Sequence, residues 1–141
     1  MKIDENVWKY FQVHLGYSDQ EMEIFKKDPR WSKILEKSDE LLKKTIIFEV
    51  IESHGCNIEH NVGDQFIFSP EGYMLAHKCP KKVCPYIMPT MSRLMYLIQE
   101  RMYEGLDPRP FFYRGHCEDV GLKCGGWGQI LIEAKIVDRN K

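Results

Sequence analysis

Hydrophobic side chains in the first third of the chain recur at the spacings of one α-helix face, i and i+3 followed by i+4 or i+7. These positions are Trp8, Phe11, Leu15, Trp31, Ile34 and Leu35. Two polar patterns predict helix starts: Ser18-Asp-Gln-Glu21 is a capping box, and Asp28-Pro29 is an N-cap followed by proline in the first turn. Residues 1–44 are therefore predicted to form a helical arm of about three helices that packs on the rest of the chain or on a second copy.

The hydrophobic period changes to two after residue 44, which indicates strands. Residues 45–52 are rich in β-branched side chains, residues 65–68 repeat the pattern, and residues 129–137 alternate small or branched apolar side chains with mostly polar ones. Shorter strands are expected at residues 73–76 and 111–114. No repeated βαβ unit occurs, so the strands predict a small, mostly antiparallel sheet or half-barrel.

One long helix interrupts these strands, from about Thr90 to Glu104. Thr90 is placed to cap the helix and Gly105 to end it. Its apolar face contains Met91, Leu94, Met95, Ile98 and Met102. Such a face is typical of a core, and methionine is also the residue of soft ligand pockets. The predicted fold class is α+β, with the helical arm followed by a sheet domain at residues 45–141 as one folding unit.

Composition narrows the class of protein. Of the 141 residues, 43% are hydrophobic and 29% charged, which is typical of a folded domain rather than a disordered chain. The net charge is −1 without a basic cluster, so neither nucleic acid nor an anionic membrane is an expected partner. No apolar run reaches the roughly 20 residues of a membrane span, and the first residues lack the apolar core of a signal peptide. We expect a cytoplasmic protein.

Five cysteines lie in loop-like sequence beside glycine, proline, lysine or histidine. In a reducing cytoplasm an odd number of thiols is not a closed disulfide framework, so metal binding, a catalytic thiol or free thiols remain as interpretations. A tetrahedral zinc site takes four thiolate or imidazole ligands, usually in close pairs. The pairs in this chain are Cys56-x3-His60, Cys79-x4-Cys84 and Cys117-x6-Cys124. None is the tight C-x2-C knuckle of zinc sites, and iron suits the same ligands.

Residues 45–138 resemble a family of small uncharacterised bacterial and archaeal proteins. The matching features are Gly55-Cys56, His60, Gly63-Asp64, Phe66, Cys84-Pro85 and Cys117 before the last strand. The chain departs from that pattern at Glu59, where glycine is expected, and in an added loop, Gly125-Gly-Trp-Gly128. The resemblance implies no activity. It only singles out four positions, Cys56, His60, Cys84 and Cys117. By residue type these four are a Cys3His ligand set for a zinc or iron ion, with Cys124 and Cys79 as reserve ligands.

Other residues beside these loops are further candidates. His54 and His116 are placed to orient metal ligands or to act as a general base. Glu118 and Asp119 are acid candidates, and each of the four has a solvated surface role as its alternative. Trp127 is interpreted either as a stacking platform for a flat ligand or as a plug over the core. At least one of the three glycines around Trp127 is expected to have a positive φ.

Three functions remain open at this stage. The first is a metal-binding protein, including a small metalloenzyme that acts on a small molecule. The second is a non-catalytic ligand-binding or subunit-bridging module with a structural metal, with the helical arm as a homodimer contact. The third is a thiol-dependent enzyme without a metal. The chain has no P-loop, Rossmann glycine fingerprint, zincin motif or nucleophile elbow, which removes several common enzyme classes.

Overall fold

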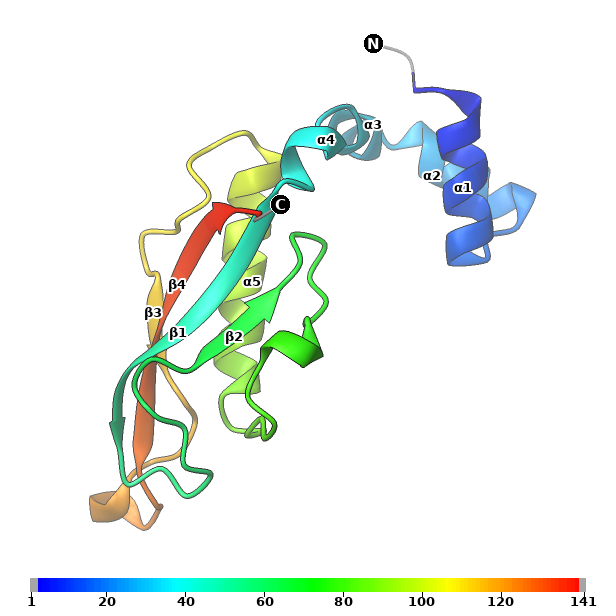
Figure 1. The fold of residues 1–141 in the computed structure, drawn as a ribbon. Helices are drawn as coiled ribbons and strands as arrows, with labels where there is room; N and C mark the ends of the chain where they lie inside the picture. Colours follow the sequence, from blue (N-terminus) through cyan, green and yellow to red (C-terminus); the bar gives the residue numbers. More distant parts are fainter. Residues whose placement is uncertain (1–2, 140–141) are drawn as a thin grey trace. The chain divides into compact units, whose positions relative to one another are not determined.

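The computed structural model of this chain describes residues 3–139. The chain divides into two compact units, Met1–Leu41 and Leu42–Lys141. The first unit is helical, and the second contains an antiparallel sheet with one long helix, as Figure 1 shows. The predicted α+β class, with helices followed by a sheet, is therefore confirmed.

The second and third helices of the helical unit begin at the two predicted signals. Within residues 3–41 its helices are α1 (Glu5–Leu15), α2 (Asp19–Lys27), α3 (Pro29–Glu36) and α4 (Ser38–Leu41). Both hydrogen bonds of the Ser18–Glu21 capping box are present, and the Asp28 carboxylate accepts the backbone N–H of Arg30. In residues 3–41 four helices stand where about three were predicted, because the backbone leaves the helix at Lys37. Ser38 then starts a separate turn, as residues that compete with helix backbone bonds often do.

Aromatic side chains form the core of the helical unit. Trp8, Met22 and Phe25 are buried together, and the rings of Trp8 and Phe25 meet edge to face with centroids 5.6 Å apart. Tyr10, Val13 and Ile24 are exposed on this unit. Of the predicted helical stripe, Trp8 is buried in this core, whereas Leu15 and Trp31 are exposed.

The second unit is built on four strands, β1 (Lys44–His54), β2 (Gln65–Phe68), β3 (Arg114–His116) and β4 (Gln129–Asp138). Within the described part of the chain their order is β2-β1-β4-β3, every neighbouring pair is antiparallel, and the sheet is open. The central strands β1 and β4 pair along almost their whole length. A β-bulge between Val50 and Glu52 shifts their register by one residue.

Strand alternation supplies one side of this unit's core. The buried strand residues are Ile46, Phe48, Val50, Phe66, Ile130, Ile132 and Ala134. The helix α5 (Met88–Tyr103) buries its predicted apolar face, from Met91 to Met102, and runs alongside the sheet in Figure 1. Burying each large apolar side chain contributes about 1.5–3 kcal/mol to stability.

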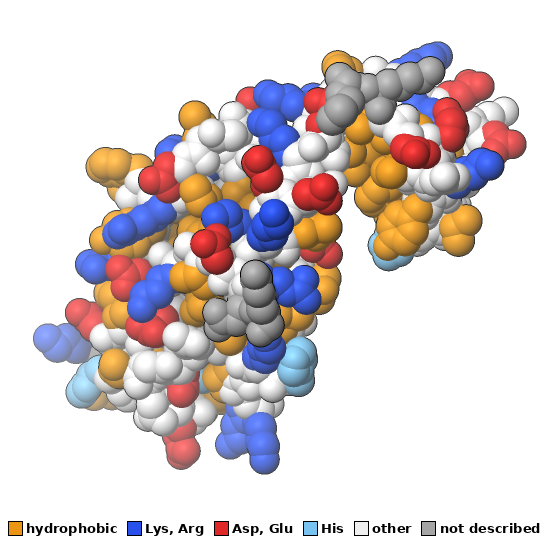
Figure 2. All heavy atoms as spheres, turned by 45° about the horizontal axis from the view of Figure 1, so that its top comes forward, with side chains coloured by type: hydrophobic (Ala, Val, Ile, Leu, Met, Phe, Trp, Pro, Cys, Tyr) orange, Lys and Arg blue, Asp and Glu red, His pale blue; other side chains and the backbone are white. Residues whose placement is uncertain are grey.

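The sheet also carries ion pairs between its strands. Lys135 lies 2.9 Å from Glu49, and Arg114 lies 3.3 Å from Glu133. The hydrogen bond from Lys135 lowers the pKa of the Glu49 carboxyl below its ordinary value. On the face shown in Figure 2, basic and acidic side chains are intermixed over the sheet domain. Charge is therefore locally balanced on that face.

Two predicted strands differ from the structure. Instead of a strand at residues 73–76, Met74 makes a single bridge to Phe68, and a 3-10 turn, η1 (Ala76–Lys78), follows. The reason is that the Cys79 sulfur takes the N–H of Ile67 on the outer edge of β2, where a further strand residue would bond. The strand expected at residues 111–114 begins only at Arg114, after a loop with prolines at positions 108 and 110.

The start of α5 also differs from the prediction. Thr90 is not its cap: the helix begins at Met88, Pro89 lies in the first turn, and Ile87 at the N-cap makes no side-chain bond. The Thr90 hydroxyl instead donates to the carbonyl of His116 at 2.5 Å. The Thr90 hydroxyl is therefore used for a long-range hydrogen bond and not for capping its own helix. The expected stop is present, since Gly105 has φ +75 directly after the helix.

The glycine-rich loop before β4 has the expected backbone. Gly125 follows the short 3-10 turn η2 (Leu122–Cys124) with φ +92, which confirms the prediction of a positive φ. Gly128 has a different constraint, because a Cβ there would collide with the carbonyl oxygen of His54 and with the backbone of Gly55. The loop therefore depends on one glycine for conformation and on another for close backbone contact.

Replacing Gly128 by alanine should destabilise the sheet domain by about 3 kcal/mol or more, since the neighbouring atoms are backbone and cannot turn aside. Gly125→Ala is the matched control. A Cβ there meets nothing within 4 Å, and only the positive φ costs about 1 kcal/mol. Urea unfolding of both variants measures the difference, and equal losses would contradict the close contact.

The packing of the helical arm stays a prediction. Removing residues 1–41 should leave a fragment that is insoluble or less stable, because we expect the arm to cover apolar surface of the sheet domain or of a second copy. The exposed Tyr10, Val13 and Ile24 side chains motivate this expectation. Size-exclusion chromatography and thermal unfolding of the fragment test it, and a monomeric fragment of unchanged stability would rule it out.

Candidate functional site

His60 lies in the loop between β1 and β2 and is only 2% exposed. The Ser53 hydroxyl donates to its carbonyl oxygen at 2.6 Å, and its ring meets Phe66 edge to face with centroids 5.2 Å apart. The backbone N–H of Cys84 donates to His60 Nε2 at 3.3 Å. These contacts fix the imidazole and join its loop to the segment before α5.

Burial sets the protonation state of His60. It lowers the pKa of the imidazole below the ordinary value of 6.5, and the nearby Asp64 carboxylate opposes this effect without overcoming it. Because Nε2 accepts the N–H of Cys84, we assign the remaining ring proton to Nδ1. His60 is therefore neutral at neutral pH, which is the form in which an imidazole binds a metal ion.

The segment that contains Cys84 contacts the third cysteine loop. Cys84 is 8% exposed. Two residues further on, the Tyr86 carbonyl accepts the backbone N–H of Glu118 at 2.8 Å. The bond from the Thr90 hydroxyl to the carbonyl of His116 makes a second connection. The loop after β3 is thus held against the start of α5.

Cys117 is held by β4. Its backbone N–H donates to the carbonyl of Ile130 at 3.1 Å, and the Ile130 N–H donates to the Cys117 sulfur at 3.5 Å. Ile130 is in turn the register partner of Ser53, whose hydroxyl bonds to His60. The structure therefore brings the segments of His60, Cys84 and Cys117 into one connected set of hydrogen bonds, which we call the Cys/His network.

Cys56 begins a tight turn in the same loop as His60. Its carbonyl accepts the N–H of Glu59 at 3.1 Å, and its side chain is half-buried. Glu59 has φ +64, and among residues 3–139 it is the sole non-glycine residue with a positive φ. That conformation costs a residue with a side chain about 1–2 kcal/mol. Glycine, which the resemblance leads one to expect at this position, is the residue that the turn favours.

The two reserve cysteines lie outside this network. The Cys79 sulfur accepts the N–H of Ile67 at 3.2 Å and so occupies the edge of β2. Ile67 pairs with Ile47 on β1. At the rise of a strand, Ile47 lies about 20 Å along β1 from Ser53, the residue of that strand that bonds to His60. Cys124 is exposed at the end of η2. Cys79 therefore has a structural role at a different place in the sheet.

The Cys/His network does not present a complete metal cage. Across residues 3–139, no group of three or more His, Cys, Asp or Glu side chains is positioned to hold a metal ion. Cys56, Cys84 and Cys117 are free thiols. A metal ion at His60 Nε2 would displace the N–H of Cys84, so ligation requires these loops to move.

The remaining predicted site residues are mostly in water. His54, His116 and Glu118 are exposed. Trp127 is 65% exposed, which agrees with a surface platform and not with a plug over the core. The exposed positions of these side chains leave them free to meet a ligand, but the structure places none of them in a cavity with the buried His60.

Asp119 has a role that sequence reasoning missed. Its Oδ1 accepts the backbone N–H groups of Gly121 at 2.8 Å and Trp127 at 3.0 Å, and its carbonyl accepts the side-chain amide of Gln129 at 2.6 Å. An aspartate two residues before a glycine is typical of a turn in which the carboxylate bonds the backbone, and this was the available signal. Asp119 therefore shapes the loop that carries Trp127.

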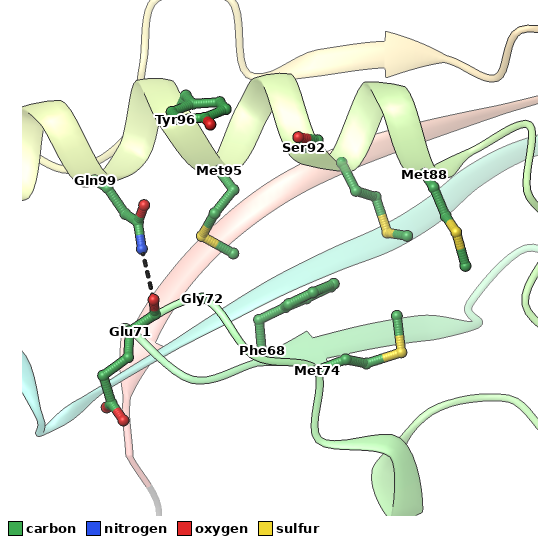
Figure 3. A pocket seen from close by; sticks show the side chains of 10 residues that line it. Phe68, Glu71, Gly72, Met74, Met88, Ser92, Met95, Tyr96 and Gln99 are labelled. Atoms are coloured by element: carbon green, nitrogen blue, oxygen red, sulfur yellow. Dashed lines mark hydrogen bonds between the residues drawn. The ribbon is translucent and has the colours of Figure 1, made fainter. Parts of the chain in front are cut away.

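A second candidate site is a groove between α5 and the turn after β2, drawn in Figure 3. It encloses about 400 Å³. Its lining, which we call the methionine groove, consists of Phe68, Glu71, Gly72, Met74, Met88, Met91, Ser92, Met95, Tyr96 and Gln99. The Gln99 amide donates to the carbonyls of Pro70 and Glu71 at 3.2 and 3.0 Å and so ties the turn to the helix. Sequence reasoning identified the helix face but missed the opposite wall, which depends on a long-range contact.

No protein-family model, curated protein or solved structure matches this chain. The family resemblance drawn from the sequence therefore stays a prediction. In the part of the chain that the structure covers, no helix combines the length and the apolar character that crossing a membrane requires.

The free energy of unfolding should decrease as the pH falls below 6.5, because of His60. Its pKa in the folded protein is lower than the ordinary value of 6.5, so the unfolded chain takes up a proton first. The stabilisation is complete above pH 6.5 and is lost as the pH falls towards the folded pKa. Urea unfolding across this range measures the slope.

The variant His60→Gln should remove this contribution to the slope. His54→Gln, at an exposed position, is the control and should keep it. If His60→Gln unfolds with the same pH dependence as the parent protein, burial of the neutral imidazole is not the cause.

Proposed function

We propose that the sheet domain is a metal-binding module that holds one zinc or iron ion with Cys56, His60, Cys84 and Cys117. The observation that carries the proposal is the Cys/His network, in which hydrogen bonds join segments that are distant in the sequence. Three thiolates and one imidazole are the ligand set of a tetrahedral site. Cys56 shares a loop with His60, so the fourth ligand requires no further segment of the chain.

The chemistry of His60 supports this role. Burial keeps the imidazole neutral, and a neutral nitrogen is what a metal ion needs. A bound ion would also favour release of the thiol protons, because thiolates are the ligating form. Ligation through Nε2 exchanges the hydrogen bond from Cys84 for a metal bond. We therefore expect the segment before α5 to move when the ion binds.

Among the functions left open by the sequence, a non-catalytic module fits the geometry best. A catalytic zinc keeps one position open for water. His60 and Cys84 are instead buried. A metal-free thiol enzyme needs a thiol activated by a neighbouring base, whereas the Cys117 sulfur accepts a hydrogen bond from the Ile130 backbone. A metal that ties three loops together would stabilise the end of the sheet.

The full chain purified without oxygen should contain about one zinc or iron ion per molecule, as measured by elemental analysis. Cys84→Ser and Cys117→Ser should each lower that content several-fold, because each removes a thiolate ligand. X-ray absorption at the metal edge should give metal–sulfur distances of about 2.3 Å and a metal–nitrogen distance of about 2.0–2.1 Å for zinc.

Cys124→Ser is the matched control, since it removes an exposed thiol outside the Cys/His network and should leave the metal content unchanged. A protein that contains no metal after purification with or without oxygen, and that takes up neither added zinc nor ferrous ion, would refute the proposal. Equal loss of metal in Cys124→Ser and Cys117→Ser would refute the ligand set.

A further inference from the structure

We propose that the methionine groove is a separate site for a soft monovalent metal ion, Cu(I) or its redox-stable analogue Ag(I). Four thioether side chains line it, those of Met74, Met88, Met91 and Met95. The three from α5 are spaced i, i+3 and i+7, which places them on one face of the helix. Met74 comes from the opposite wall, and Figure 3 shows the labelled methionines extending into the space beside Phe68.

The donor chemistry selects the ion. Thioether sulfur is a soft ligand that favours Cu(I) over hard ions such as Mg²⁺ or Ca²⁺. It carries no charge, so a monovalent ion leaves less uncompensated charge in the groove than a divalent one. The lining residues include no lysine or arginine that would repel a cation, and Glu71 is the acid among them.

The methionine groove is open to solvent on one side, and its two walls, α5 and the turn after β2, are held together by hydrogen bonds. Met88 is 45% exposed and leaves an opening to solvent, whereas Met91 and Met95 are buried. Gln99 fixes the turn that carries the opposite wall. Methionine is unbranched and has three rotatable bonds, so its sulfur can be reoriented without moving the backbone. The hydrogen bonds of Gln99 therefore hold the helix and turn in place while the side chains close on an ion.

This site shares no residue with the Cys/His network and does not depend on it. Thiols bind Ag(I) more tightly than thioethers do, and the chain has five cysteines. A test must therefore report on the methionines themselves and must continue beyond one equivalent of ion per cysteine.

The experiment is a titration of the full chain, labelled with ¹³C at the methionine methyl groups, with silver nitrate. NMR follows each methyl signal separately. We expect the signals of the four groove methionines, Met74, Met88, Met91 and Met95, to shift together and saturate, while those of Met22 and Met102 stay in place. Met102 is the internal reference, because it is buried on the same helix but does not line the groove.

A pair of variants separates ligation from packing. Met88→Leu keeps the apolar side chain and removes the sulfur, and it should weaken Ag(I) binding at the remaining groove methionines by at least about tenfold. Met102→Leu is the matched control and should leave binding unchanged. Groove signals that stay in place after all the thiols are saturated would overturn the proposal, as would equal effects of Met88→Leu and Met102→Leu. Loss of the metal from the Cys/His network in Cys117→Ser would not alter the expected shifts.

Discussion

The antiparallel pairing of β1 with β4 is the contact on which the rest of the sheet domain depends. It aligns the buried side chains of the two central strands into one apolar face, along which α5 runs. At its far end the same pairing sets Ser53 opposite Ile130, and so brings the loops of His60 and Cys117 together. A shift of one residue in this register would move the apolar side chains of one strand to the opposite face from those of its partner. The core and the Cys/His network would then be lost together.

Local sequence patterns were sufficient for most elements of the fold. Three of these patterns are the capping box at Ser18, the N-cap at Asp28 and the alternation in β4. Each depends on interactions within a few residues, so the sequence alone is enough to predict it. Two of the errors occurred where a distant group competes for the same atoms. The Cys79 sulfur takes the edge of β2, and the His116 carbonyl takes the hydroxyl of Thr90. Neither partner can be identified from spacing.

The types of ligand residue in the candidate site could be predicted from the sequence, but their positions relative to one another could not. Residue type identified thiols and an imidazole as ligands, and the sequence placed them in loops. Only the structure separates the roles of the cysteines: Cys117 belongs to the Cys/His network, Cys79 completes a strand edge, and Cys124 is in solvent. Sulfur therefore has two proposed uses in this domain, as thiolate at one end of the sheet and as thioether in the methionine groove. The two uses suit ions of different charge and softness.

The bulge in β1 changes what the end of the sheet can contain. The alternation that buries Ile46, Phe48 and Val50 would, if continued, direct Glu52 and His54 into the apolar interior. An unpaired carboxylate there would carry a large desolvation penalty. The extra residue reverses the sequence of inward and outward positions, so both side chains remain exposed. A single inserted residue thus divides one strand into a water-excluding half and a hydrophilic half, and the loops beyond it can be polar without weakening the core.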